Sequence, residues 1–142
     1  MNRACVIAVD GSEPSLRAVD YAIADAASRQ QSPHIYLVNV QPALSSNVTR
    51  FIDAKTVEDF HRETGDETLA SAQARLKAAG LPHSAHVLVG EAAPSLVDFA
   101  KAKNCDMIIM GAHGFGSVLG MVMGSVATKV LHLSTLPVLL IK

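Results

Sequence analysis

The chain has 142 residues, of which 49% are hydrophobic, only 4% are aromatic and 18% are charged. This length favours a single domain spanning residues 1–142, with a core of aliphatic side chains rather than aromatic rings. A formal net charge of −1 argues against nucleic acid or an anionic membrane as the main partner, and two cysteines are too few for a disulfide-stabilised scaffold.

The predicted elements alternate along the chain. In order, apolar periodicity and turn residues predict a strand at Ala4–Val9, a helix from Ser12 to about Arg29, a strand at Ile35–Val40, a helix from about Thr56 to Gly80, a strand at His86–Val89, a helix from about Glu91 to Asn104, a strand at Met107–Met110, a helix at Ser125–Leu133 and a strand at Val138–Ile141. This order predicts an open, mostly parallel α/β sheet of five strands with helices on both faces.

Two parts of this pattern are less regular. Residues 43–55 are polar and aperiodic, which predicts a mobile loop, and Gly65 predicts a kink or a late start in the helix that follows. Phe60 is expected on the buried face of that helix, as are Val126 and Leu133 on the last helix.

The cysteines and the N-terminal segment indicate in which cellular compartment the protein is expected. Asp10 interrupts the apolar run that begins at Ala4, so the N-terminus does not resemble a secretory signal. We therefore expect a cytoplasmic protein. Cys5 lies in the first predicted strand and Cys105 just before the fourth, so we expect the two thiols to lie near each other and to stay reduced.

Histidines give no strong metal signal. His83 and His86 are three positions apart in an extended segment and are expected to face opposite sides of the sheet, which disfavours a shared metal ion. The other histidines outside the glycine-rich segment, including His132, are expected at the surface. His113 lies within that segment.

The most informative segment is Met107–Ser125, MIIMGAHGFGSVLGMVMGS. An apolar strand leads into a glycine-rich loop and then into a predicted helix start. Glycines let a backbone approach a ligand closely, and the free N–H groups of a helix start favour an anion. The alternative is a membrane span, because the 22 residues Met107–Thr128 contain no Asp, Glu, Lys or Arg. The clustered glycines, the absence of an aromatic belt and the alternating neighbours favour the phosphate-binding interpretation.

The spacing of the glycines separates this segment from the common nucleotide motifs. It fits neither a P-loop nor a dinucleotide fingerprint, and instead matches G-x2-G-x9-G-[ST] at Gly111, Gly114, Gly124 and Ser125. Together with Asp10-Gly11-Ser12 and the closing Pro137–Ile141, this motif makes the chain resemble the universal stress protein family along nearly its whole length. The resemblance implies a Rossmann-like sheet of order 3-2-1-4-5, an ATP or AMP site with Mg²⁺ on the phosphates, and homodimers.

The implied strand order brings the first, second and fourth strands together where ligands bind in open α/β sheets. Adenine is expected near Asp10 and Val40, and the phosphates on the glycine loop and the start of the last helix. His113 is either a phosphate donor or a loop residue facing water. The expected nucleotide-binding residues are Asp10, Val40, Met110, Gly111, His113, Gly114, Gly124, Ser125 and Val126.

Two departures from the family pattern weaken the case for turnover. Ala112 stands where a hydroxyl residue is common, and Phe115 stands where a basic residue is common. Asp10 and His113 are the only candidate general bases, and neither has an obvious orienting partner. The sequence thus favours an adenine-nucleotide-binding stress-response protein that acts as a sensor or signalling dimer. The alternatives are a slow ATPase or nucleotide hydrolase, and a ligand-free interaction dimer.

The predicted dimer uses the last strand. Val138–Ile141 is apolar and forms a sheet edge in the implied order, with Lys142 as its only charged neighbour. Such an edge invites pairing with a second copy of the chain.

Overall fold

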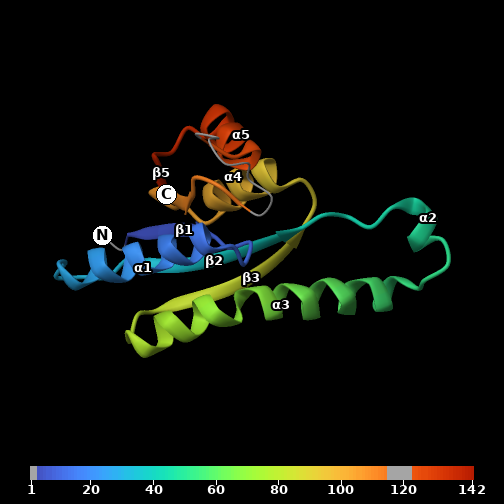
Figure 1. Ribbon diagram of the computed structural model, residues 1–142, viewed down its shortest axis with the longest axis horizontal. Helices are drawn as coiled ribbons and strands as arrows, with labels where there is room; N and C mark the ends of the chain where they lie inside the picture. Colours follow the sequence, from blue (N-terminus) through green and yellow to red (C-terminus); the bar gives the residue numbers. More distant parts are fainter. Residues whose placement is uncertain (1–2, 115–122) are drawn as a thin grey trace.

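The computed structural model describes residues 3–114 and 123–142, and it contains one five-stranded sheet (Figure 1). The strand order is β3-β2-β1-β4-β5, and every neighbouring pair is parallel. This confirms the predicted fold class and strand order. The strands are β1 at Ala4–Ala8, β2 at His34–Gln41, β3 at His83–Val89, β4 at Met107–Gly111 and β5 at Val138–Ile141.

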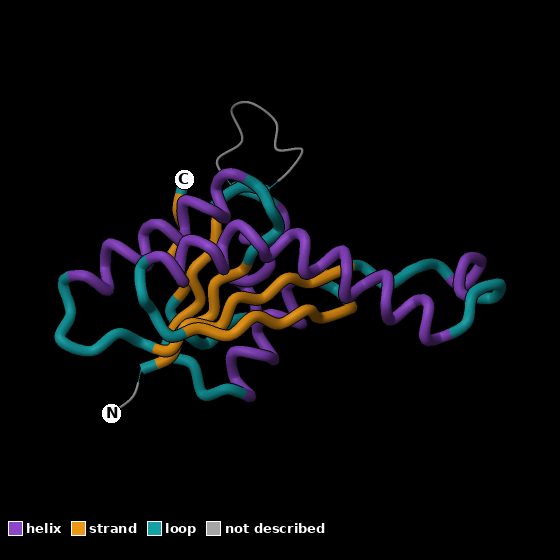
Figure 2. Tube along the Cα trace, turned by 90° about the horizontal axis from the view of Figure 1, so that it is seen from below, coloured by secondary structure: helices purple, strands orange, loops and turns teal. Residues whose placement is uncertain are grey.

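Helices cover both faces of this sheet, as Figure 2 shows. On one face α1 (Glu13–Ala27) and α3 (Ala54–Ala78) pack against Ile7, Ile35 and Ile109. On the other face α4 (Ala92–Ala102) and α5 (Ser125–Leu133) pack against alternate residues of the same strands. Because both faces are covered, the central strands are apolar at successive positions rather than at every second one.

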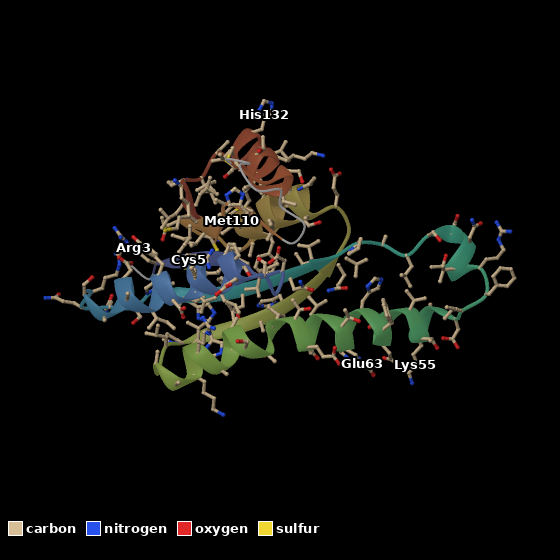
Figure 3. The ribbon with its side chains drawn as sticks, viewed as in Figure 1. Arg3, Cys5, Lys55, Glu63, Met110 and His132 are labelled. Atoms are coloured by element: carbon tan, nitrogen blue, oxygen red, sulfur yellow. The ribbon has the colours of Figure 1, made fainter. Side chains whose placement is uncertain are left out.

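Cys5 and Cys105 illustrate the contact between β1 and β4. Cys5 pairs in register with Met107, two residues after Cys105, and both cysteines are buried and free. Figure 3 shows Cys5 within the body of the molecule and His132 on the outer side of α5. The expected neighbourhood of the two strands that carry or follow these cysteines is thereby confirmed.

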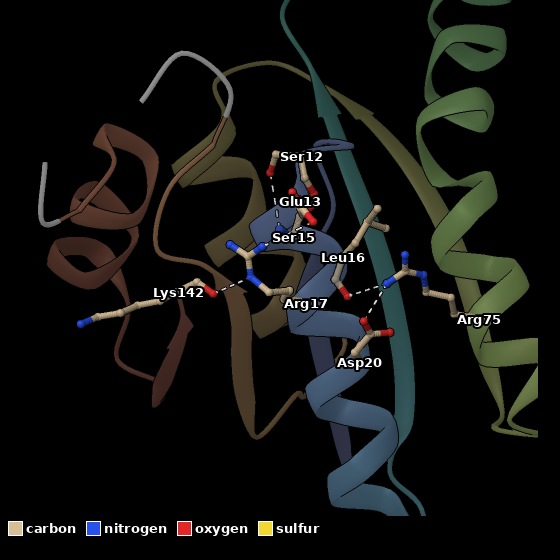
Figure 4. A network of polar contacts seen from close by, with 8 residues as sticks. All are labelled: Ser12, Glu13, Ser15, Leu16, Arg17, Asp20, Arg75 and Lys142. Atoms are coloured by element: carbon tan, nitrogen blue, oxygen red, sulfur yellow. Dashed lines mark hydrogen bonds and ion pairs between the residues drawn. The ribbon is translucent and has the colours of Figure 1, made fainter. Parts of the chain in front are cut away.

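Polar contacts tie α1 to distant parts of the chain (Figure 4). Arg17 Nε donates to the carbonyl of Lys142 over 2.7 Å, and Asp20 forms an ion pair of 2.7 Å with Arg75 of α3. These contacts join α1 to the C-terminal strand on one side and to α3 on the other.

The predictions for the region before β3 were partly wrong. The segment 43–55, expected to be a loop, contains the single-turn helix α2 (Ser46–Thr49), and α3 begins at Ala54. With the start of α3 this segment forms an arm that extends past the end of the sheet (Figure 1). Phe60 is 48% exposed, whereas the next residue, His61, is 5% exposed, so the buried face of α3 passes through His61 rather than through Phe60.

Gly65 produces neither a kink nor a late start. The helix runs through it without a break, and a Cβ at this position would lie 2.4 Å from a methyl carbon of Val87. The glycine therefore permits α3 to cross β3 at close range. The strand β3 begins at His83, three residues before its predicted start, because its pairing with β2 begins at Ile35 opposite His83.

The last helix has the predicted bounds but a different inward face. Ala127 and Val130 are buried, whereas Val126 and Leu133 are 39% and 40% exposed. Ala127 and Val130 share a core cluster with Leu96 and Val97 of α4, so the face of α5 that meets α4 runs through these two residues rather than through Val126. His61, expected at the surface, is buried on α3. None of the helices in the described part of the chain is long and apolar enough to cross a membrane.

Candidate functional site

A cavity of about 350 Å³ lies at the carboxyl ends of β1, β2 and β4, the position at which open α/β sheets bind ligands. All nine residues predicted from the sequence line it. The full lining consists of Ala8, Val9, Asp10, Ser15, Val38, Asn39, Val40, Ala92, Leu96, Met110, Gly111, Ala112, His113, Gly114, Gly124, Ser125, Val126 and Ala127. The cavity thus draws together five segments that are far apart in the sequence.

Asp10 follows β1 and organises the turn into α1. Its Oδ1 accepts hydrogen bonds from the backbone N–H of Ser12, over 2.9 Å, and from the Ser12 hydroxyl. Ser12 Oγ accepts in turn from the N–H of Ser15 at the start of the helix. Ser12 therefore caps α1, and Asp10 supports this cap through one oxygen while its second oxygen lies on the side of Gly114.

The two glycines after β4 are required for different reasons. A Cβ on Gly111 would lie 2.7 to 3.0 Å from atoms of Pro14 and Ser15, so this glycine lets α1 approach the end of β4. A Cβ on Gly114 would instead lie 2.6 Å from Asp10 Oδ2, inside the cavity lining. Gly111 therefore serves the packing of the fold, while Gly114 keeps space open beside the Asp10 carboxylate.

The start of α5 presents backbone donors to the cavity. Gly124 is the N-cap residue, and because glycine has no side chain it cannot cap the N–H groups of the first turn. Its own N–H donates to the carbonyl of Ala112 over 2.6 Å. Ser125, Val126 and Ala127 line the cavity, and the N–H groups of a first helical turn have no partners within the helix. This arrangement suits an anion.

His113 completes this side of the cavity. Its Nδ1 is buried and has no hydrogen-bond partner among the residues that the structure describes. Of the two departures noted in the sequence, Ala112 is buried in the lining, and Phe115 falls outside the described residues. No lysine or arginine appears among the described lining residues, so the polar groups available to a ligand are backbone N–H groups, the Asp10 carboxylate and a few neutral side chains.

Asn39 is a buried polar residue among the nine lining residues that were not predicted from the sequence. It is 4% exposed, and its side-chain amide donates to the carbonyl of Val9 over 2.8 Å, which joins the ends of β1 and β2. Its Oδ1 accepts from the side-chain amide of Gln41. A single polar residue inside the apolar run Ile35–Val40 was the available signal.

The described residues bring together no group of three His, Cys, Asp or Glu side chains that could hold a metal ion. The cavity contributes only one carboxylate, that of Asp10. A second hollow, of about 710 Å³, lies between the arm, α3 and β3, and none of the predicted site residues lines it.

Comparisons with known proteins agree with this architecture. Residues 1–142 match the profile of the universal stress protein family. The universal stress protein MJ0531 of Methanocaldococcus jannaschii is 30% identical over 138 residues, covering 96% of this chain and 80% of the relative.

Two solved structures extend the likeness. The hypothetical protein MJ0577 has the same fold, with a TM-score of 0.85 at 23% identity over 100% of this chain and 96% of its own. The universal stress protein from Archaeoglobus fulgidus in complex with dAMP is 28% identical, with a TM-score of 0.69 over 100% of this chain and 98% of its own.

Proposed function

Since the chain belongs to the universal stress protein family, we propose that it binds an adenine nucleotide in the cavity at the carboxyl ends of β1, β2 and β4. In this proposal the nucleotide is ATP or AMP, and its binding makes the protein a sensor or signalling component of a stress response. The observation that carries the proposal is the convergence of all nine motif-derived residues on one cavity.

The lining has the two kinds of surface that a nucleotide needs. Apolar side chains such as Val40, Leu96 and Met110 offer a flat purine its contacts. The glycine loop and the first turn of α5 offer backbone donors to a phosphate. The buried Nδ1 of His113, which has no partner among the described residues, supports the same assignment, because a ligand atom could satisfy it. A relative at 28% identity was solved with dAMP, which is a nucleotide of this class.

The proposal favours binding over turnover. Asp10 is held by Ser12, and among the described residues His113 has no carboxylate that would orient it as a base. Mg²⁺ enters only as a companion of the phosphates, with Asp10 as the one carboxylate of the cavity able to contact it. We also propose a homodimer that pairs the free edge of β5, for reasons given in the Discussion.

Calorimetric titration with AMP and ATP tests the site. Gly114→Asp places a second carboxylate beside Asp10 in the space that Gly114 keeps open. We expect it to weaken binding at least about a hundredfold, or ~2.7 kcal/mol, through like-charge repulsion and lost space. Mass spectrometry of the purified wild-type protein should also detect a co-purified adenine nucleotide.

Ser71→Asp is the matched control, because it adds the same charge on the exposed side of α3, away from the cavity. We expect this variant to keep wild-type affinity, and both variants to keep the wild-type circular dichroism spectrum. Gly111 is unsuitable for this test, since any side chain there collides with the backbone of α1. Wild-type affinity in Gly114→Asp would place the site elsewhere, and a wild-type protein without affinity for either nucleotide would refute the proposed function.

A further inference from the structure

The charges around the cavity distinguish this site from one built for a long phosphate chain. Asp10 is the only charged side chain among the described lining residues. Among the described lining residues, a bound phosphate chain would therefore meet backbone N–H groups, the His113 imidazole and one carboxylate, with no lysine or arginine.

The nearest lysine in the last helix is already paired. Lys129 lies one turn after Ser125, which lines the cavity, and its Nζ forms an ion pair with Glu91 Oε1. Glu91 is the N-cap residue of α4, directly before the lining residue Ala92. The ion pair thus joins the start of α4 to the second turn of α5 at the rim of the cavity. Both side chains are more than half exposed, so the pair is accessible to solvent and to ligands.

We propose that this cavity selects among adenine nucleotides by charge, preferring a nucleoside monophosphate to a triphosphate, and that Glu91 enforces the preference by holding Lys129. This inference rests on the proposed nucleotide binding. One phosphate fits the backbone donors of the glycine loop and of the α5 start. Asp10 Oδ2 lies on the side of Gly114, so the structure puts this carboxylate beside the glycine loop as well as beside the expected adenine position, and each further phosphate on the loop adds negative charge near it. Among the described residues, Lys129 is the only lysine within a helical turn of the lining, and it is neutralised by Glu91.

Glu91 acts here as a specificity residue that does not itself contact the first phosphate. An exposed ion pair is weak, so its effect on affinity is expected to be moderate rather than absolute. Removing the Glu91 charge frees Lys129 to turn toward the cavity, and the gain should grow with the number of phosphates on the ligand.

The test is calorimetric titration of the full chain with AMP, ADP and ATP at low ionic strength. EDTA is present, because Mg²⁺ would neutralise part of the ATP charge. For the wild type we expect affinity to fall at least about tenfold from AMP to ATP. For Glu91→Gln we expect the affinity for ATP to rise about threefold to tenfold, the scale of one exposed ion pair, while that for AMP changes less than about twofold.

Two further variants isolate the cause. Glu91→Gln combined with Lys129→Met should lose the gain for ATP, because no free lysine remains. Asp59→Asn removes a carboxylate from another surface ion pair, that with Arg62 on α3, and should leave the ratio of AMP to ATP affinity unchanged.

The outcomes separate this inference from the function on which it rests. Equal or tighter binding of ATP by the wild type overturns the charge selection, as does an AMP-to-ATP ratio that Glu91→Gln leaves unchanged, and in both cases nucleotide binding itself stands. If the wild type binds none of the three nucleotides, the proposed function fails and this inference fails with it.

Discussion

Cys5 and Cys105 show at the scale of single residues how burial controls chemistry. Burial raises the pKa of the Cys5 thiol to about 12, with a further contribution from the neighbouring Cys105. Burial is the main cause that raises the pKa of the Cys105 thiol to about 11, and the negative charge of the nearby Asp106 raises it further. The thiolate is the reactive form of cysteine. Both thiols are therefore protected from alkylation and oxidation, because they are buried and because they stay protonated.

We therefore expect native protein at pH 8 to react with iodoacetamide at least about a hundredfold more slowly than unfolded protein. Mass spectrometry of timed samples, with and without urea, measures the two rates. Rapid labelling of Cys5 in the native state would contradict the buried position of β1.

The same shifts predict how stability depends on pH. Because the folded-state pKa values lie above the ordinary value of 9.0, the contribution of these thiols is complete below pH 9 and is lost as pH rises toward 11 to 12. Urea unfolding at pH 8 and pH 10 should show this loss. It should be smaller in a variant that carries both Cys5→Ala and Cys105→Ala, in which the other titrating groups are unchanged.

At the scale of elements, the crossing of α3 over β3 depends on one glycine. A Cβ at Gly65 would lie 2.4 and 2.6 Å from the two methyl carbons of Val87. Branched side chains in strands have little freedom to move aside. The long helix therefore needs glycine at this position although glycine is a poor helix former.

We expect Gly65→Ala to lower the free energy of unfolding by about 1–2 kcal/mol, because the cost of overpacking exceeds the gain in helix propensity. Urea denaturation measures the change. Ser71→Ala, on the exposed side of the same helix, should change stability by less than about 0.5 kcal/mol.

A double-mutant cycle identifies the contact responsible. In a Val87→Ala background the added methyl of Gly65→Ala has room, and the substitution should become neutral or stabilising. The same loss in both backgrounds would show that Val87 is not the obstacle.

At the scale of the whole molecule, β5 leaves one edge of the sheet unpaired within the chain. Pro137 and Ile141 direct their carbonyls to Ile108 and Ala112 of the β4 side. Since alternate residues of a strand direct their backbone groups to opposite sides, Val138 and Leu140 face the open edge. Pairing with β5 of a second copy would satisfy these groups and closes with two-fold symmetry.

We expect the protein to be a dimer at micromolar concentration and Leu140→Pro to make it a monomer that keeps its fold. Proline removes an N–H on the open edge, where edge strands tolerate it. Light scattering gives the mass, and circular dichroism reports the fold. Leu139→Pro is the contrasting variant, because it removes a bond to β4 and should unfold the chain. A stable wild-type monomer would refute this interface.

The sequence by itself determined the order of the five strands and of the four longer helices, the parallel sheet and nine of the residues that line the candidate site. Apolar periodicity records which face of each segment is buried, and this is why α5 and β5 were predicted with the bounds that the structure gives them. The spacing of Gly111, Gly114 and Gly124 placed the candidate site at the end of β4. This was possible because a loop needs glycine where its own backbone must approach a ligand or another segment closely, and the spacing of such glycines is visible in the sequence.

Tertiary structure alone decided the features that depend on residues far apart in the chain. Gly65 appeared to be a helix breaker until Val87 was placed against it, and Gly111, predicted as a ligand residue, was found to lie against Pro14 as well as in the cavity lining. The pairing of Glu91 with Lys129 spans 38 positions, so no local pattern could predict it. Periodicity reports whether a side chain is buried, but the neighbour that it meets is set by how whole elements pack.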